Sequence, residues 1–180
     1  MGKLHNVCES GDIETVKSLI FDGNINEKNN IEYTPLHYAC FYGHCEIAEL
    51  LIRHGANINE KNICGNTPLH FACRNRYYGI AHLLISHGAN INDKNFYEHT
   101  QLEEECNVGN FHMAKFLLAN NANISITKNK ETLIMIARKH GHTNVTELLE
   151  KEIKKRIYIL SLILQHDVLK HHVIRKFNLL

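Results

Sequence analysis

A segment of 33 residues recurs along this chain and constrains its fold more than any other feature. The letters TPLH at residues 34–37 return at residues 67–70, and the stretch at residues 47–59 returns, with few changes, at residues 80–92. A unit of this length cannot bury an apolar face by itself, so successive units have to stack on one another. The sequence therefore predicts a repeat solenoid.

Each unit has the pattern of two helices and a turn. A Thr followed by Pro is a typical helix start, because the Thr side chain caps a free N–H group and Pro already has a helical φ angle. The first helix of a unit thus begins at Thr34 and at Thr67. The second helix spans residues 46–54 and ends at Gly55, which suits the left-handed position after a helix. The polar residues that follow predict an extended turn that projects from the stack.

The repeat pattern divides the chain into an array and a tail. We expect an incomplete first unit at residues 1–27 and four units at about residues 28–60, 61–93, 94–125 and 126–149, followed by a tail at residues 150–180. The array carries 13 Lys and Arg residues against 16 Asp and Glu, whereas the tail carries 7 against 3. The array is therefore mildly acidic and the tail basic.

These motifs resemble the ankyrin repeat. The TPLH letters, the Gly-His pair at residues 43–44 and the run at residues 50–59 occur in order at one period, and the resemblance extends over about residues 4–149. It implies an all-α repeat solenoid, in which stacked helix-turn-helix units carry hairpin fingers and a helical cap closes the C-terminal end. It also implies a concave protein-binding face built by the finger tips and the first helices.

Three residues depart from the glycines of the pattern. Arg76 stands at the place of Gly43, and Glu32 and Glu98 stand at the finger position that Gly65 keeps. Residues other than glycine rarely adopt positive φ angles. We therefore expect the two fingers that carry Glu to be less regular.

The third unit carries acidic residues inside its first helix. Glu103 and Glu105 occupy the places of the His and the Ala of the motif. A carboxylate is expensive to bury without a partner. The sequence therefore predicts a helix that is shifted or frayed here, or a carboxylate that is ion-paired, with His70 as a candidate partner.

The last unit has no signal that ends its second helix, because neither Gly nor Pro follows Gly141. We expect this helix to run on to about Leu164. Ile153, Ile157, Leu160 and Leu164 recur at helical spacing, and such a stripe suits the covering of the last apolar face of a stack. The tail is therefore predicted to be a helical cap with its basic residues in solvent.

No residue pattern points to catalysis or to a cofactor. The framework histidines and cysteines recur at the structural period, which a catalytic pair has no reason to do. His166, His171 and His172 lie near Asp167 in the tail, but an ordinary polar helix face explains them better than a metal site. We therefore expect a protein that is not an enzyme and that holds no cofactor or metal.

The composition indicates a protein that acts inside a cell. The N-terminus lacks the apolar run of a secretory signal, and the longest apolar run, residues 157–164, is far shorter than the roughly 20 residues of a membrane-spanning helix. The six cysteines show no close pair and fit reduced thiols. We expect a monomer in the cytosol, in the nucleus, or in a host cytosol if the chain comes from an intracellular parasite or virus. No membrane partner is expected, and the basic tail has too few aromatic residues to favour nucleic acid.

The contact positions that the resemblance implies lie at the finger tips and at the ends of the first helices. They are Ile31, Tyr33, Phe41, Tyr42, Ile63, Asn66, Arg74, Asn75, Phe96, Tyr97 and His99. Most are aromatic or Arg, the types that dominate binding hot spots, although packing between fingers is an alternative explanation for some. The sequence predicts an adaptor or inhibitor that binds a partner protein of unknown identity on these residues.

One other function remains open. A substrate receptor of a ubiquitin ligase would bind its target on the repeats and the ligase core through F-box-like helices in the tail. Residues 157–180 are apolar enough for this role, but they lack the Leu-Pro opening of an F-box. Deleting residues 150–180 separates the explanations, because loss of a cap unfolds the stack and loss of a binding site does not.

Overall fold

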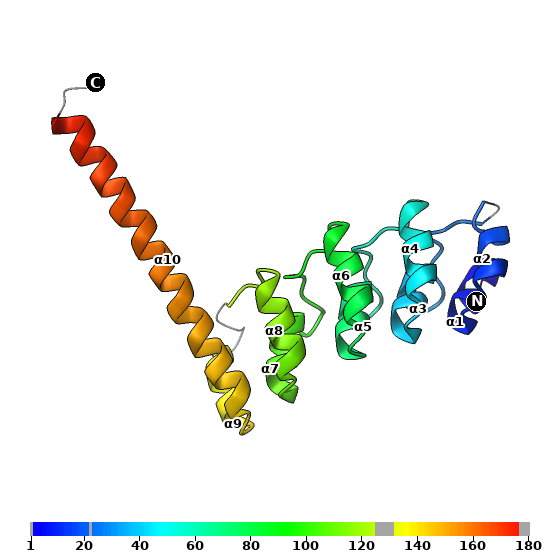
Figure 1. Cartoon of the computed structure of the whole chain (residues 1–180). Coiled ribbons are helices and arrows are strands. Elements are labelled where there is room, and N and C mark those ends of the chain that lie inside the picture. The colour runs from blue at the N-terminus through cyan, green and yellow to red at the C-terminus, as the bar shows by residue number, and fades with distance from the viewer. Residues whose placement is uncertain (1, 22, 125–131, 177–180) are drawn as a thin grey trace.

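The computed structural model describes residues 2–21, 23–124 and 132–176, with side chains up to residue 164. The helices are α1 (Lys3–Ser10), α2 (Ile13–Leu19), α3 (Pro35–Tyr42), α4 (Cys45–Arg53), α5 (Pro68–Arg74), α6 (Tyr78–Ser86), α7 (Gln101–Val108), α8 (Phe111–Ala119), α9 (Leu133–Lys139) and α10 (Thr143–Lys176). Figure 1 shows the first four helix pairs side by side in chain order, followed by α9 and the long α10. The predicted all-α repeat solenoid is confirmed.

The core of the stack repeats with the period of the sequence. Equivalent leucines of the first and second helices are all at most 1% exposed: Leu36, Leu69, Leu102, Leu51, Leu84 and Leu117. The first helices α1, α3, α5, α7 and α9 pack on one another in order, and α2, α4 and α6 form a second row. Ala39 and Ala72 are fully buried between first helices and let them approach closely. Burial of each leucine stabilises the stack by roughly 2 kcal/mol.

The His of the TPLH motif joins one unit to the next. The N–H group of Thr34 donates to Nδ1 of His37 over 3.1 Å, which places the ring proton on Nε2. Nε2 donates in turn to the carbonyl oxygen of Asn66, 3.1 Å away at the end of the following finger. Burial lowers the pKa of His37 to about 4, so the ring is neutral at pH 7. One side chain thus caps a helix and holds a neighbouring finger.

Each described finger turns around one Asn side chain. Oδ1 of Asn62 accepts hydrogen bonds from the N–H groups of Cys64 and Asn66, both at 2.9 Å. Asn29 and Asn95 make the equivalent two bonds in the fingers before and after. An Asn side chain that bonds in this way mimics a backbone turn and fixes the course of the loop.

The two fingers that carry Glu are as regular as the finger that carries Gly. The φ angle is 57° at Glu32, 76° at Gly65 and 63° at Glu98. The N–H group of each residue donates to the carbonyl oxygen of its finger Asn over 2.8 to 2.9 Å. Our expectation of less regular fingers is therefore wrong. The hydrogen bonds of the Asn side chain offset the cost of a left-handed residue with a Cβ, which is about 1–2 kcal/mol.

Helix α7 also accommodates its acidic residues without distortion, which contradicts the prediction of a shifted, frayed or ion-paired site. Glu103 takes over the capping role of the motif His, because its Oε2 accepts from the N–H group of Thr100 over 3.0 Å. Glu105 is 4% exposed, and no described residue forms an ion pair with it. Nδ1 of His70 lies 2.7 Å from Nε2 of Gln101 and pairs with neither carboxylate. The capped helix start thus forms at Thr100 with both Glu residues buried.

Helix α10 runs beyond the predicted end, and most of the predicted cap stripe does not cover the array, although Ile153 is half-buried. It continues to Lys176 and leaves the stack (Figure 1). Val145 and Leu149 are fully buried, so only the first turns of the helix cover the end of the array. The later members of the predicted stripe are 58 to 64% exposed: Ile157, Leu160 and Leu164. A continuous helix carries these residues past the last unit, where no described part of the chain covers them.

Removing residues 157–180 should therefore leave the stack folded. The large apolar side chains lost up to Leu164 are exposed, so we expect the melting temperature to change by less than about 3 °C. Removing residues 143–180 also takes away Val145 and Leu149, each with a cost of about 2 kcal/mol, and should lower it by about 10 °C or more. Thermal melts followed by circular dichroism compare the two truncations. An equal and large decrease in the melting temperature of both truncated proteins would show that residues 157–180 stabilise the array as a cap.

Candidate protein-binding surface

Five aromatic rings form one continuous cluster. Tyr33 precedes α3, which carries Tyr38, Phe41 and Tyr42, and Phe71 belongs to α5. The ring centroids of Tyr33 and Phe71 lie 5.2 Å apart, those of Phe41 and Phe71 5.7 Å, and those of Phe41 and Tyr42 4.9 Å. Tilted and edge-on ring contacts at such distances are favourable. We call these five residues the aromatic cluster.

The aromatic cluster has a buried base and an exposed rim. Phe71 is 3% exposed, whereas Phe41 and Tyr42 are each 40% exposed. A ring that is already supported by its neighbours loses little conformational freedom when a partner covers it. The rim is therefore preformed for contact with another molecule.

The finger tips form a second exposed row. Backbone hydrogen bonds join successive tips, from the Ile63 N–H group to the Ile31 carbonyl oxygen over 3.4 Å and from Phe96 to Cys64 over 2.9 Å. Ile31, Ile63, Phe96 and Tyr97 are all exposed, and so is His99 at the end of the third finger. The structure leaves these predicted contact residues accessible, but no ring contact joins Phe96 or Tyr97 to the aromatic cluster.

Asn66 does not lie where we expected it. It was predicted to be an exposed contact residue, yet it is 7% exposed. Its N–H group donates to Asn62 and its carbonyl oxygen accepts from His37, so the finger and the neighbouring helix start enclose it. Asn66 is a framework residue, and the expectation of exposure is wrong for it.

Two further predicted contact residues have partners within the protein. Nδ2 of Asn75 donates to the carbonyl oxygens of Phe71 at 3.0 Å and Phe41 at 3.3 Å, which supports the aromatic cluster from one end. Arg74 donates to Oε2 of Glu104 over 3.2 Å. This ion pair is partly exposed and contributes less than about 1 kcal/mol, so a binding partner can replace it at little cost.

Three residues of this surface, Tyr38, Phe71 and Glu9, are not among the contact residues predicted from the sequence. Tyr38 and Phe71 stand at the same place in successive units, 33 residues apart, so an aromatic residue that recurs at the structural period was an available signal. Glu9 of α1 accepts a hydrogen bond from the Tyr42 hydroxyl over 2.8 Å, and this bond raises the pKa of Tyr42. No signal pointed to Glu9, because the first unit lacks the TPLH motif that aligns the others.

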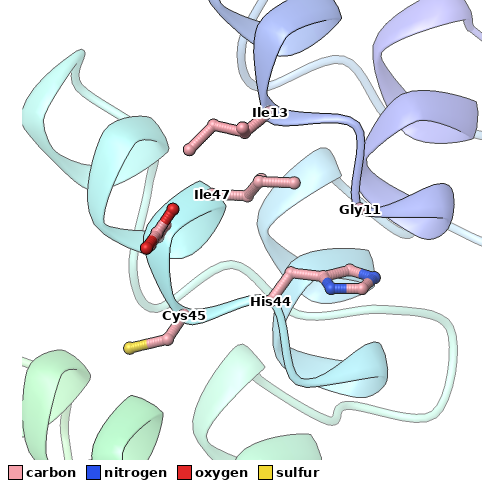
Figure 2. A pocket seen from close by; sticks show the side chains of 6 residues that line it. Gly11, Ile13, His44, Cys45 and Ile47 are labelled. Atoms are coloured by element: carbon pink, nitrogen blue, oxygen red, sulfur yellow. The ribbon is translucent and has the colours of Figure 1, made fainter.

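A hollow between the first two helix pairs is too small to indicate a small-molecule site. It is lined by Gly11, Ile13, His44, Cys45, Glu46 and Ile47 (Figure 2). Its volume is about 210 Å³, whereas ligand pockets usually have roughly 300–1,000 Å³. The Cys45 side chain points away from the His44 ring in Figure 2, and Nε2 of His44 bonds to the carbonyl oxygen of Glu9 at 3.0 Å. The two side chains therefore do not form a nucleophile and base.

Among the residues that the structure describes, no group of three or more His, Cys, Asp or Glu residues could hold a metal ion. The side chains of His166, His171 and His172, with Asp167, lie outside the described residues. Among the described residues, no helix is long and apolar enough to cross a membrane.

Comparison with known proteins decides the family. A family model described as ankyrin repeats in three copies matches residues 4–95, which is about half of the chain. The chain belongs to the ankyrin-repeat family. Ankyrin repeats are protein–protein interaction modules and are generally not catalytic, so a protein is the partner that the family implies.

Three curated relatives each match under a third of this chain. A palmitoyltransferase of Candida glabrata is 32% identical over 59 residues, which are 31% of this chain and 8% of that protein. Human protein phosphatase 1 regulatory subunit 27 is 43% identical over 57 residues, 31% of this chain and 37% of the subunit. A putative ankyrin repeat protein of fowlpox virus is 40% identical over 50 residues, 27% of this chain and 36% of the viral protein. The chain thus spans well under half of the length of each.

Proposed function

We propose that this ankyrin array is a non-catalytic adaptor or inhibitor that binds a partner protein across the aromatic cluster and the finger tips. One observation carries the proposal: Phe41 packs on the buried ring of Phe71, and Phe41 and its neighbour Tyr42 both stay exposed. Aromatic side chains held in this way have the chemistry and the setting of binding hot spots. The similarity to a protein named as a phosphatase regulatory subunit fits such a role. The proposal includes a monomer that acts inside a cell.

The proposal is tested by capturing a partner from a cell lysate on the immobilised chain, identifying it, and measuring its affinity for variants. We expect Tyr42→Ala or Tyr97→Ala to weaken binding about thirtyfold, because truncating a central aromatic anchor typically costs about 2 kcal/mol. Both side chains are exposed, so the melting temperature should change little. Titration calorimetry and thermal melts give the two readouts.

Tyr78→Ala is the matched control, because Tyr78 is an exposed tyrosine on α6 in the second row of helices, where it packs against Phe116. Its removal should leave the affinity unchanged. The opposite pattern, in which Tyr42→Ala and Tyr97→Ala keep full affinity but melt at a much lower temperature, would mean that these rings brace the array and that the interface lies elsewhere.

A second function, that of a substrate receptor for a ubiquitin ligase, is supported by the apolar surface of α10. Seven large apolar side chains are exposed there: Ile157, Tyr158, Ile159, Leu160, Leu162, Ile163 and Leu164. In this role the tail contacts the ligase core through F-box-like helices, while the repeats hold the target. Ligase core subunits should then co-purify with the full chain and be lost on deletion of residues 157–180. Their absence from the full-chain capture would contradict this function.

A further inference from the structure

A carboxylate without a cationic partner lies at the edge of the aromatic cluster. Oε1 of Glu9 accepts from the Tyr42 hydroxyl over 2.8 Å, so the side chain of α1 is held against a ring of α3. Among the described residues, no Lys, Arg or His side chain forms an ion pair with Glu9. Glu9 is partly exposed and Tyr42 is exposed, so a group from solvent can reach both.

Two tyrosine rings stand beside this carboxylate in parallel. Tyr38 and Tyr42 lie one helical turn apart on α3, and their ring planes differ by 12° with centroids 6.3 Å apart. The face of an aromatic ring attracts a cation placed within about 6 Å of its centroid. The His44 ring lies parallel to Tyr42 as well, with centroids 6.4 Å apart and planes that differ by 16°. Glu9, Tyr38 and Tyr42, which we call the Glu9 patch, therefore combine a negative charge with two tyrosine rings, of which Tyr42 is exposed and Tyr38 partly exposed.

The surroundings of the Glu9 patch are acidic. Residues 1–66 carry 5 Lys and Arg residues against 9 Asp and Glu. Four of these five cations are engaged elsewhere: Lys17 with Glu14, Lys28 with Glu60, Arg53 with Glu49, and Lys61 with the carbonyl oxygen of Lys94. The fifth, Lys3, lies at the opposite end of α1 from Glu9. In the described part of residues 1–66, no Lys or Arg side chain is paired with Glu9, and the neighbouring His44 ring is bonded through Nε2 to the carbonyl oxygen of Glu9 over 3.0 Å. The potential at the Glu9 patch favours a positive group from a partner.

We propose that the Glu9 patch binds the guanidinium group of an arginine side chain in the partner protein. This inference rests on the proposed function and names the chemistry of one contact. A guanidinium group is planar, so it stacks on a tyrosine face while its N–H groups reach a carboxylate. An ammonium group is more strongly hydrated and cannot stack, so lysine fits this combination less well.

The inference is tested without knowing the partner by adding blocked arginine, N-acetyl-arginine methylamide, to the isotope-labelled full chain. Amide and aromatic NMR shifts at millimolar ligand should move at Glu9, Tyr38 and Tyr42. The citrulline analogue, which has the same shape without the charge, should leave them in place. Glu9→Gln and Tyr42→Ala should each weaken arginine binding at least about fivefold. Glu46→Gln, a change of an exposed carboxylate on α4, should not.

Tyr42→Phe adds a variant that keeps the ring and removes only the hydroxyl that holds Glu9, and it should bind arginine more weakly than the original chain. Equal shifts with citrulline, equal affinity for the lysine analogue, or shifts outside the Glu9 patch would overturn the inference. These outcomes leave the proposed function intact if a captured partner still depends on Tyr42 and Tyr97. Arginine-specific shifts with no such dependence would instead count against the proposed function alone.

Discussion

Replacing Glu105 with Ala is expected to stabilise the protein far more at pH 8 than at pH 5, by a difference of about 2.5 kcal/mol in the free energy of unfolding. Burial raises the pKa of Glu105 to about 7, from an ordinary value of 4.5. Between pH 4.5 and pH 7, the Glu105 carboxyl group therefore binds a proton more tightly in the folded protein than in the unfolded chain. Its stability falls as the pH rises from 4.5 to 7 and stays lowered above 7. The Ala variant has no carboxyl group at this position, so its stability does not fall in this way.

The comparison has to be made between variants at each pH, because His37 and His70 act in the opposite direction. Burial lowers the pKa of each to about 4, so they destabilise the folded protein as the pH falls below 6.5. They are present in both proteins and cancel in the difference. Urea unfolding at pH 5 and pH 8 provides the measurement.

Glu105→Gln is the matched control, since it keeps the size of the side chain and removes the charge, and it should show the same pH dependence as the Ala variant. Glu46→Ala, at an exposed carboxylate, should show none. A Glu105→Ala variant that is less stable than the original chain at pH 8 would reveal a specific structural role for the carboxylate.

Gly65→Ala is expected to lower the free energy of unfolding by about 3 kcal/mol. Gly65 adopts a φ angle of 76°, and a Cβ added there would lie 2.5 Å from the backbone nitrogen of Phe96. Backbone atoms of the next finger cannot move aside as a side chain can. The two fingers would have to separate, and the hydrogen bond from the Phe96 N–H group to the Cys64 carbonyl oxygen would weaken.

Gly88→Ala separates the cost of backbone strain from the cost of the clash with the next finger. Gly88 also has a positive φ angle, 93°, but a Cβ there would meet no atom within 4 Å. We expect this variant to lose only about 1 kcal/mol, from backbone strain alone. Urea titrations of both variants measure the free energy of unfolding. Equal decreases for Gly65→Ala and Gly88→Ala would show that the close approach of the fingers does not contribute to stability.

The sequence by itself determined the architecture, because the signals for it are local. A Thr, a Pro and a His within four residues specify a capped helix start at Thr34 and again at Thr67, and both starts occur there. The leucines that recur 33 residues apart specify which faces are buried. Each of these signals involves only residues that are close together in the sequence. Because the period is fixed, a unit that is predicted correctly once is predicted correctly in its copies as well.

Only the tertiary structure decided how the departures from the pattern behave and which side chains meet. Glu32 keeps a regular turn because Asn29 holds the finger, and Glu105 is buried in the stack, where burial raises its pKa to about 7. Tyr33 and Phe71 touch although 38 positions separate them in the chain. Such outcomes depend on the packing of one unit against the next, where burial and hydrogen bonds outweigh the preference of a single residue, and a pattern read along the chain carries no measure of that balance.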